Sequence, residues 1–355
     1  MKKILSLFAA LFLAVAVWAQ PSGYYNSANG LTGNQLKVAL HNIIKGHTTI
    51  TYAQIWNAFW STDNKGNGVV WDMYSDRPGG TPPYIYHLGQ DQCGNYKVEG
   101  DCYNREHSWP QSWFNEQTTP RTDLHHIFAT DGFVNFKRSN HAFGEVRSAD
   151  WISKNGSKLG PCKTPGFSGT VFEPIDEYKG DFARALMYMS VRYYGEDSGW
   201  GSSDMTNKSE IKPWAMTMLL RWSDQDPVSQ KEIDRNNAIY NDYQHNRNPF
   251  IDHPEFARMI WDPNWSVSED IPLNVPVYLF PNPVERGEAV HLSGNEYKFD
   301  AVEICDLCGH QIAKTAGNAI GGLEIDVPAS MEPGLYIVRL MKKGRIVKNL
   351  KLNVK

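Results

Sequence analysis

The chain has 355 residues, of which 41% are hydrophobic and 21% are charged, and its formal net charge is −4. This length supports a sizeable hydrophobic core and two domains. The nearly balanced charge excludes a global basic field that would attract nucleic acid. Residues 103–165 carry eight Lys/Arg and six Asp/Glu, a net of +2 with His neutral. A bound metal ion would therefore be the main positive charge in that region.

The N-terminus has the pattern of an export signal. Two lysines precede a largely apolar run over residues 4–18, and Val17 and Ala19 are placed as cleavage determinants. About fifteen residues are too few to span a bilayer comfortably, so we interpret residues 1–19 as a cleaved signal peptide and not as an anchor. No later segment has the pattern of a membrane span, which predicts a secreted protein.

Hydrophobic periodicity predicts several helices in the body of the chain. Apolar residues recur at helical spacing twice within residues 30–62, which indicates two helices. The run V-V-W-D-M-Y that follows predicts a strand over residues 69–74. Further helices are expected over residues 181–194, 213–222 and 228–244, the last directly after a proline.

The composition changes near residue 263. Residues 266–275 have the composition of a polar linker, and beyond them apolar residues alternate in the strand period. Short strands separated by turns predict a small C-terminal β-sandwich over residues 276–355. The larger domain is then expected to span residues 20–265.

Residues 103–140 concentrate the groups that carry chemistry. They contain an Arg-Glu-His-x-x-Pro run at 105–110, an Asp-Leu-His-His run at 123–126 and an Asn-x-x-Arg-Ser-Asn run at 135–140. Hydrolysis of a phosphodiester needs a base for water, a hard cation for the phosphate and a donor for developing charge. All three kinds of group are present in this stretch.

These three runs resemble the bacterial endonuclease I family, whose members are secreted or periplasmic nucleases with a ββα-metal (His-Me finger) site. The resemblance covers roughly residues 23–262, and it includes the helix start at 33–37, the run at 180–189 and the run at 244–250. It implies an α+β fold, with a mainly helical body around a ββα-metal nuclease core, followed by the C-terminal β-sandwich.

The resemblance assigns His107 as the general base and Glu106 as a metal ligand. A neutral imidazole can take a proton from the attacking water. Adjacent strand residues point to opposite faces, so Glu106 and His107 share one pocket only if the strand twists, bulges or ends there. In the family, the glutamate reaches the metal from the end of the strand.

Two asparagines are candidates for the second metal ligand. If residues 131–140 are helical, Phe133, Phe136 and Asn140 lie on one side and Asn135 on the other. We expect the face with two phenylalanines to be buried, so Asn140 bonds backbone or caps the helix, and Asn135 faces the site. The family motif also places the ligand at Asn135. A Glu and Asn oxygen pair with water suits Mg²⁺, with Ca²⁺ or Mn²⁺ as further candidates.

A cation should stabilise the transition state at the phosphate. The family takes an arginine from the segment between the two strands, where this chain has only Arg121. Arg138 is the alternative, and Arg105 is a candidate to contact the phosphate backbone or an internal carboxylate. Of the neighbouring histidines, we expect His126 to hold a phosphate or to orient His107, and the other, His125, to belong to the core.

The cysteines fit an exported protein, because disulfides persist outside the cytosol. Cys93 and Cys102 bracket a short segment just before the Glu-His pair, and we expect them to be bonded. Cys305 and Cys308 form a C-x-x-C without the βαβ context of a redox motif, so they are interpreted as packing residues or an incidental bridge. Cys162 is left without an expected partner.

The C-terminal region carries a second resemblance. A Pro-Asn-Pro-Val run at 281–284, an Ile-x-Asp-Leu-x-Gly run at 304–309 and a Pro-Gly-Leu-Tyr run at 333–336 resemble the sorting domain of type IX secretion cargo. The resemblance implies contact with the secretion machinery, passage through the periplasm and release or attachment at the cell surface. The alternative is a generic immunoglobulin-like accessory domain.

We therefore expect a monomeric, secreted, metal-dependent endonuclease without sequence preference. Its expected substrate is DNA, with RNA as a second candidate. Two alternatives stay open. One is a phosphodiesterase for small extracellular nucleotides, and the other is a non-catalytic surface module that binds metal or nucleic acid.

Overall fold

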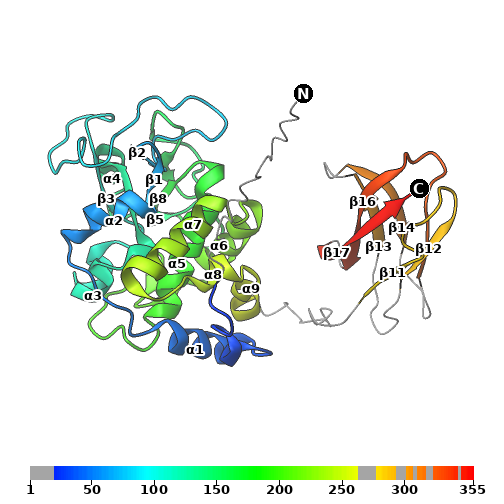
Figure 1. Ribbon diagram of the computed structural model, residues 1–355. Helices are drawn as coiled ribbons and strands as arrows, with labels where there is room; N and C mark the ends of the chain where they lie inside the picture. Colours follow the sequence, from blue (N-terminus) through cyan, green and yellow to red (C-terminus); the bar gives the residue numbers. More distant parts are fainter. Residues whose placement is uncertain (1–19, 263–276, 293–300, 307–309, 317–322, 343–344) are drawn as a thin grey trace, which may run out of the picture. The chain divides into compact units, whose positions relative to one another are not determined.

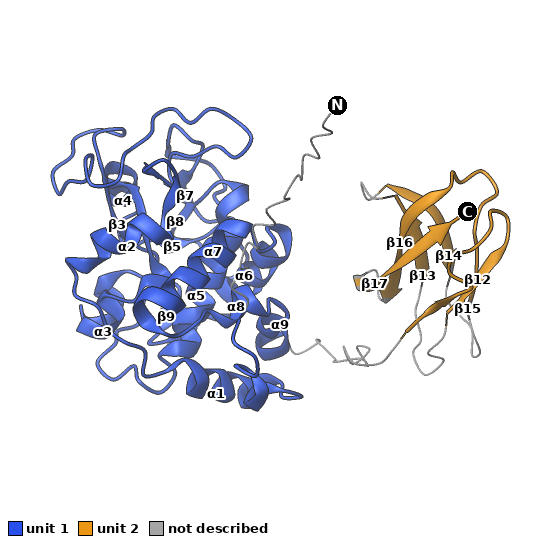
Figure 2. Cartoon of the chain, viewed as in Figure 1, with its two compact units in different colours: residues 1–265 blue, residues 266–355 orange. Residues whose placement is uncertain are grey.

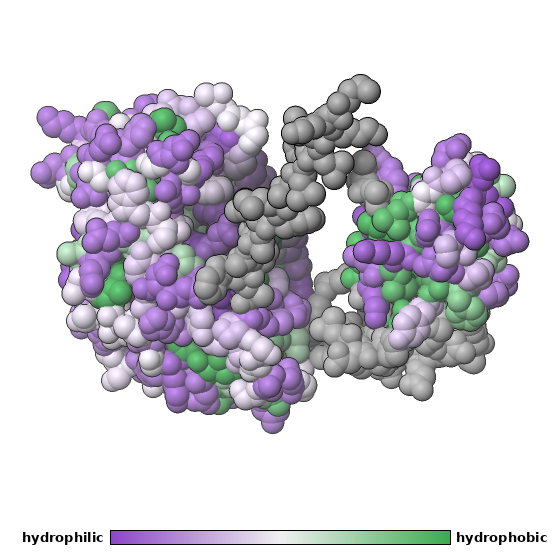
Figure 3. All heavy atoms as spheres, in the orientation of Figure 1, coloured by the Kyte–Doolittle hydropathy of each residue, from purple (hydrophilic) through white to green (hydrophobic). Residues whose placement is uncertain are grey.

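The computed structural model describes residues 20–262, 277–292, 301–306, 310–316, 323–342 and 345–355. The chain divides into two compact units, Met1–Trp265 and Ser266–Lys355 (Figure 2). The expected signal peptide, the expected linker and Cys308 lie outside the described residues. Among the described residues, no helix is long and apolar enough to cross a membrane. Hydrophilic residues cover most of the larger unit on the face drawn in Figure 3.

The larger unit begins with the two helices that its apolar spacing predicts. They are α1 (Gly33–Ile44) and α2 (Gln54–Thr62). Leu36, Leu40 and Ile44 of α1 and Ile55 and Phe59 of α2 are buried, whereas Trp60 is exposed. The periodic pattern therefore marks most of the faces that pack on the rest of the unit. A small antiparallel hairpin follows, formed by β1 (Asn64–Gly66) and β2 (Val69–Val70).

The prediction of a strand over residues 69–74 is correct only for its first two residues. After Val70, a turn forms around Asp72, whose side chain accepts a hydrogen bond from the backbone N–H of Tyr74 at 2.8 Å. The carbonyl of Asp72 accepts from the backbone N–H of Asp76, also at 2.8 Å. Tyr74 is buried by this turn, so its aromatic side chain serves the core without belonging to a strand.

Two antiparallel strands and a short helix carry the motif residues. Strand β3 (Tyr103–His107) pairs with β4 (Ile127–Asp131), with the last residue of β3 opposite the first of β4. Helix α4 (Gly132–Arg138) begins directly after β4 and packs against β3 (Figure 1). Asp131 caps the helix by accepting a hydrogen bond from the backbone N–H of Val134 at 2.7 Å. The segment between the strands contains α3 (Thr118–Arg121).

The β3–β4 pair lies between two hydrophobic clusters. Ile127 and Ala129 of β4 belong to the cluster that includes α2, whereas Phe128 belongs to the cluster that includes α5. Tyr103 of β3 also belongs to the α2 cluster. Because side chains alternate along a strand, the odd-numbered residues of β3 face α2 and Glu106 faces the opposite side.

Two further small sheets complete the strands of the larger unit. The four-stranded sheet has the order β5-β8-β7-β6, in which β5 and β8 are parallel and the other pairs antiparallel. Its strands are β5 (Ala142–Phe143), β6 (Trp151–Ile152), β7 (Lys158–Pro161) and β8 (Thr170–Glu173). A hairpin of β9 (Thr206–Asn207) and β10 (Glu210–Ile211) follows.

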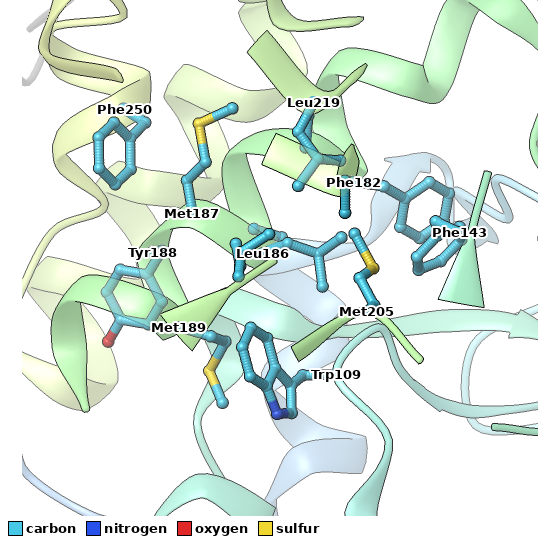
Figure 4. Packing of buried hydrophobic residues seen from close by; sticks show 14 of the residues in the cluster. Trp109, Phe143, Phe182, Leu186, Met187, Tyr188, Met189, Met205, Leu219 and Phe250 are labelled. Carbon is cyan, nitrogen blue, oxygen red and sulfur yellow. The ribbon is translucent and has the colours of Figure 1, made fainter. Parts of the chain in front are cut away.

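Helix α5 (Lys179–Arg192) forms the centre of the larger unit, because all of its residues are buried. Figure 4 shows its side chains Phe182, Leu186 and Met189 within the main hydrophobic cluster. The ring of Phe182 stacks on that of Phe143 at a centroid distance of 4.7 Å. The remaining helices are α6 (Pro213–Gln225), α7 (Gln230–Ala238), which continues as a π-helix over Ile239–Gln244, α8 (Pro249–Asp252) and α9 (Glu255–Trp261).

The smaller unit contains two antiparallel sheets in its described residues. One has the order β11-β12-β15 and the other β14-β13-β16-β17. Their strands are β11 (Leu279–Phe280), β12 (Ala289–Leu292), β13 (Ala301–Cys305), β14 (Gln311–Ala316), β15 (Leu323–Asp326), β16 (Gly334–Lys342) and β17 (Arg345–Val354). One hydrophobic cluster draws on both sheets, with Val290 and Ile325 from the first and Val302, Val338 and Leu352 from the second.

The expected mainly helical body describes the larger unit only in part, because residues 20–262 also hold four small sheets. The expected bond between Cys93 and Cys102 is confirmed, with their Cα atoms 5.8 Å apart. It closes the loop just before β3. Cys162 and Cys305 are buried free thiols.

Candidate active site

The motif residues meet in a cavity of about 420 Å³ where β3 ends. Residues from both faces of β3 line it, together with the segment after the strand and the C-terminal part of α4. The lining residues are Tyr52, Asn104, Arg105, Glu106, His107, Pro110, Gln111, Ser112, Asn135, Arg138, Ser139 and Asn140. Glu106 and His107 thus share a cavity although their pairing with β4 shows no bulge, because the cavity reaches both faces of the strand.

His107 has the orientation that a general base needs. Its Nε2 lies 3.0 Å from the carbonyl oxygen of Arg121. Since a carbonyl only accepts hydrogen bonds, Nε2 must carry the proton, which leaves the lone pair on Nδ1. The Nε2 atom of Gln111 lies 3.5 Å from this Nδ1. Burial, reinforced by the nearby His126, lowers the pKa of His107 to about 3, so the imidazole is neutral at ordinary pH.

Glu106 is buried, with 1% of its surface exposed, and is held through one of its two oxygens. Its Oε1 accepts hydrogen bonds from Tyr74 Oη at 3.1 Å and from Arg138 Nη1 at 2.9 Å. Within the part of the chain that the structure describes, no group donates to Oε2. Burial raises the pKa of Glu106, and the charge of Arg138 acts in the opposite direction. One carboxylate oxygen therefore keeps its capacity to bind a ligand.

Arg138 joins α4 to the end of β3. Its Nη1 donates to Glu106 and, at 2.8 Å, to the carbonyl of His107, and its Nη2 donates to the carbonyl of Ser108 at 2.5 Å. The residue is 1% exposed. Three acceptors, one from a side chain and two from the backbone, therefore hold this guanidinium in place.

The two candidate asparagines differ in position, because Asn135 lies within α4 and Asn140 lies beyond its end. Phe136 is 60% exposed, so the expected burial of a Phe133–Phe136 face is wrong. Helix α4 ends at Arg138, and Asn140 lies beyond its end, exposed and lining the cavity. Asn135 is half-buried in the cavity wall, and its Nδ2 donates to the carbonyl of Arg105 at 3.3 Å. This contact leaves the Oδ1 of Asn135 available.

The donor set of the cavity suits a hard divalent cation. Glu106 Oε2 and Asn135 Oδ1 supply a carboxylate and an amide oxygen, and the polar cavity has room for water as further ligands. Within the described ranges, no group of three or more His, Cys, Asp or Glu side chains could hold a metal ion. The residues therefore fit Mg²⁺ or a similar ion that keeps several waters, and not a closed zinc site.

Arg121 does not line the cavity but contacts residues that do. Its Nε donates to Gln111 Oε1 at 2.9 Å, and its guanidinium lies 4.4 Å from the ring centre of Tyr52. Gln111 thus links Arg121 to His107. The positive charge of Arg121 is therefore separated from His107 by a single side chain, that of Gln111.

The two histidines of the 123–126 run lie in a 3-10 turn before β4. His126 is fully buried and outside the cavity lining, and its Nε2 lies 2.7 Å from the carbonyl oxygen of Pro120. Its ring is 5.5 Å from that of His107 without a hydrogen bond between them. His125 is a core residue as expected, with its Nε2 3.2 Å from the carbonyl oxygen of Asn246.

A second set of buried polar groups lies behind this turn, and we call it the Asp123 cluster (His47, Asp123, Tyr188, Tyr193 and Gln244). Asp123 accepts hydrogen bonds on both oxygens, from Tyr188, Tyr193 and Gln244 at 2.9, 3.0 and 3.0 Å. Burial alone would raise the pKa of Asp123, but the neighbouring histidines and the hydrogen bond from Gln244 hold this pKa well below its usual range. The cluster is buried and has no free carboxylate oxygen, so it serves the structure.

Sequence reasoning missed Tyr52, Tyr74 and Gln111 as site residues. Gln111 follows the Arg-Glu-His-x-x-Pro run directly, so reading one residue further would have included it. No local pattern marks the tyrosines. Tyr52 lines the cavity from the loop before α2, and Tyr74 contacts Glu106 from the turn after β2. Only the tertiary structure brings them there.

The cavity thus brings together a neutral buried histidine, a buried carboxylate and an amide oxygen, a combination that can support hydrolysis by water. The comparisons with known proteins agree with this class. Residues 32–255 match the model of the endonuclease I family. An extracellular ribonuclease of Bacillus amyloliquefaciens is 41% identical over 253 residues, which cover 68% of this chain and 79% of the relative. An extracellular ribonuclease of Bacillus subtilis (strain 168) is 38% identical over 264 residues, covering 71% and 83%.

The chain belongs to the endonuclease I family. It is a nuclease, an enzyme that hydrolyses phosphodiester bonds, and nucleic acid is its substrate.

Proposed function

We propose that this protein is a secreted, metal-dependent endonuclease that hydrolyses DNA and RNA without sequence preference. The observation that carries the proposal is the arrangement of His107. Its Nε2 is tied to the carbonyl of Arg121, and its unprotonated Nδ1 belongs to the same cavity as the free oxygens of Glu106 and Asn135. In this proposal β3, β4 and α4 form a ββα-metal finger.

The hydrolytic step follows from this arrangement. Nδ1 of His107 takes a proton from a water molecule, and the water oxygen forms a bond to phosphorus while the bond to the ester oxygen breaks. The leaving oxygen takes up a proton from the surrounding water, and His107 returns its proton to the solvent, so a phosphate monoester and a free hydroxyl result. A base with a depressed pKa stays unprotonated in mildly acid surroundings, and the bond from Nε2 to Arg121 keeps its orientation fixed.

Glu106 and Asn135 would hold Mg²⁺, with Ca²⁺ or Mn²⁺ as alternatives. When bound, such an ion would stabilise the charge on the phosphate and on the leaving oxygen. Arg138 and Tyr74 orient the Glu106 carboxylate for this task through its other oxygen. Arg121, which contacts Gln111 but does not line the cavity, would add positive charge near the scissile phosphate without touching it.

The proposed nucleophile explains why both nucleic acids should be substrates. A water molecule attacks phosphorus without help from the ribose 2′-hydroxyl, so the chemistry does not require RNA. The relatives named extracellular ribonucleases support RNA as a substrate and support secretion.

The proposed route of export uses both ends of the chain. Residues 1–19 would act as a signal peptide. Residues 276–355 would form a β-sandwich that the type IX secretion machinery recognises, and the two described sheets around one hydrophobic cluster support such a domain. The mature protein would act as a monomer in the medium or at the cell surface.

One set of digestions tests the proposal. The purified protein is incubated with supercoiled plasmid, with single-stranded RNA and with a 2′-O-methyl oligonucleotide, in a series of Mg²⁺, Ca²⁺ and Mn²⁺ and with a chelator. We expect nicking of the plasmid, cleavage of all three substrates and loss of activity with the chelator. Cleavage of small nucleotide diesters alone would indicate the phosphodiesterase, and binding of DNA without turnover would indicate the non-catalytic module.

A further inference from the structure

Two arginines flank one tyrosine at the wall of the cavity. The guanidinium carbon of Arg105 lies 3.7 Å from the ring centre of Tyr52, and that of Arg121 lies 4.4 Å from it. Arg105 also lies 4.3 Å from the ring of Trp56. The aromatic rings therefore hold two like charges close together.

Neither of these arginines has an acidic partner. Across residues 20–262, every other arginine that is not exposed has a carboxylate oxygen within 4.0 Å. These are Arg138, Arg184, Arg192, Arg221, Arg235, Arg247 and Arg258. The two arginines at Tyr52 thus differ from the rest of the larger unit in carrying charge that no carboxylate neutralises.

Arg105 keeps hydrogen-bonding capacity as well as charge. Its Nη1 donates to the carbonyl of Tyr52 at 2.9 Å, and its Nε is buried without an acceptor. No described residue accepts from its Nη2. Because the guanidinium groups of Arg105 and Arg121 lie at the same Tyr52 ring, a bound anion would relieve the repulsion between their charges.

The position of Arg105 separates it from the metal ligands. Arg105 and His107 lie on the face of β3 that meets α2, and the ring of Tyr52 stacks over that of His107 at 6.1 Å. Glu106 lies on the opposite face, beside Tyr74 and Arg138. Both faces open into one cavity. An anion at Arg105 would therefore lie on the other side of His107 from a phosphate at Glu106.

We propose that Arg105, mounted on Tyr52, binds the phosphate next to the scissile one along the nucleic-acid strand. The proposal rests on the proposed function, which places the scissile phosphate at the metal ion held by Glu106 and Asn135. It names the substrate class more closely. The preferred substrate is a chain with a second phosphate beside the bond that is cut, and an isolated diester is a poor one.

Three dinucleotides test this inference without any variant. They are thymidylyl-thymidine, the same compound with a 5′-phosphate, and the same compound with a 3′-phosphate. We expect one of the two flanked compounds to have a kcat/KM roughly tenfold to a hundredfold above that of the unflanked one, since a charged hydrogen bond to phosphate contributes that much. Equal values for all three compounds would overturn the proposal.

Substitutions then assign the effect to Arg105. In Arg105→Met the side chain can still pack on Tyr52 and Trp56, and we expect the ratio of flanked to unflanked rates to fall towards one. Arg105→Lys should retain part of the ratio, because it keeps the charge. The matched control is Arg221→Met, which removes an arginine paired with Glu145 and should leave the ratio at the wild-type value.

The outcomes separate this inference from the proposed function. Absence of metal-dependent cleavage of plasmid and RNA by the wild type would reject the proposed function. Cleavage of those polymers together with an equal loss on all three dinucleotides in Arg105→Met would reject the phosphate subsite and leave a structural role. Thermal melting followed by tryptophan fluorescence shows whether each variant folds, and if Arg105→Met does not, the wild-type ratio and Arg105→Lys decide.

Discussion

The cavity at the end of β3 and the Asp123 cluster each contain a buried carboxylate, but the two carboxylates differ in how many of their oxygens accept hydrogen bonds. In the cluster, both oxygens of Asp123 are taken by donors from distant parts of the chain. In the cavity, Glu106 is equally buried, but its hydrogen bonds use only one oxygen. Buried polar groups are normally satisfied, so the group with spare capacity marks the functional site. Burial by itself does not distinguish the two carboxylates.

The largest effect on activity should come from substitution of His107 in the cavity. We expect His107→Ala to lower turnover on plasmid by about two to four orders of magnitude, because general-base catalysis contributes that much. DNA binding should change little. Gel assays of nicking measure the effect, with His253→Ala, outside the cavity lining, as the control. Near-normal activity of His107→Ala would remove it from the mechanism.

Substitution of Glu106 should affect metal dependence, whereas substitution of Asp123 should affect stability. Glu106→Gln should weaken metal dependence, so that higher Mg²⁺ partly restores the rate, while the midpoint of unfolding changes less. Asp123→Asn should keep metal dependence but lower the free energy of unfolding by about 3 kcal/mol, because it breaks buried charged hydrogen bonds.

Metal titrations of activity and urea unfolding measure both quantities on each variant. All 12 tryptophans precede residue 266, so their fluorescence reports on the larger unit alone. If both variants lose stability equally and neither changes the metal titration, the comparison between the regions fails.

The pH dependence of stability should come from the buried histidines around the same turn. Burial, the largest cause, lowers the pKa of His125 from 6.5 to about 4. Between these values the unfolded chain binds a proton that the folded chain does not, so stability falls as pH falls from about 6.5 to about 4. The loss from His125 should reach about 3 kcal/mol.

His125→Gln keeps a donor for the carbonyl of Asn246 and removes the titration. Urea unfolding at a series of pH values should show a slope shallower by about one proton in this variant. An unchanged slope would mean that His125 already titrates in the folded state.

The two asparagines of the cavity offer a finer test. Asn135→Ala should raise the Mg²⁺ concentration for half-maximal activity by about tenfold or more, as loss of a metal-site contact does. Asn140→Ala should leave it near the wild-type value, because Asn140 lies beyond the end of α4 and is exposed. The reverse result would make Asn140 the ligand.

Truncation after residue 265 should have the smallest effect in vitro. Because the larger unit has its own hydrophobic clusters and compact contacts, we expect the shortened protein to keep its nicking activity and its midpoint of unfolding. The same truncation should prevent release from the producing cell. Loss of activity in vitro would show that the smaller unit completes the site.

Much of the larger unit could be predicted from the sequence, because its helices bury periodic apolar faces. The spacing of Leu36 and Leu40 predicts α1. Helix α6 begins at Pro213, and α7 begins shortly after Pro227. The Glu-His pair and Asn135 lie in short recognisable runs, so it could also be predicted that they meet in space. All of them line one cavity.

What failed depends on contacts between distant residues. Phe136 was expected inside because it is apolar, but Arg138 takes the inner position of α4, since three acceptors from β3 compensate its burial. Hydrophobicity along a seven-residue helix cannot foresee such partners. In the same way, the strand pattern after Val70 gave way to a turn held by the side chain of Asp72.

The three hydrogen bonds of Arg138 have a consequence for anyone who tries to transplant this site into another scaffold. They tie the end of β3 to the last turn of α4, so the elements that carry Glu106 and Asn135 cannot shift independently. A graft that copied only the Glu-His pair and the asparagine would leave the carboxylate free to rotate. Lysine could not take over, because a single ammonium cannot reproduce the planar fork of donors. The smallest transferable part is therefore the strand, the helix and the arginine between them, taken together.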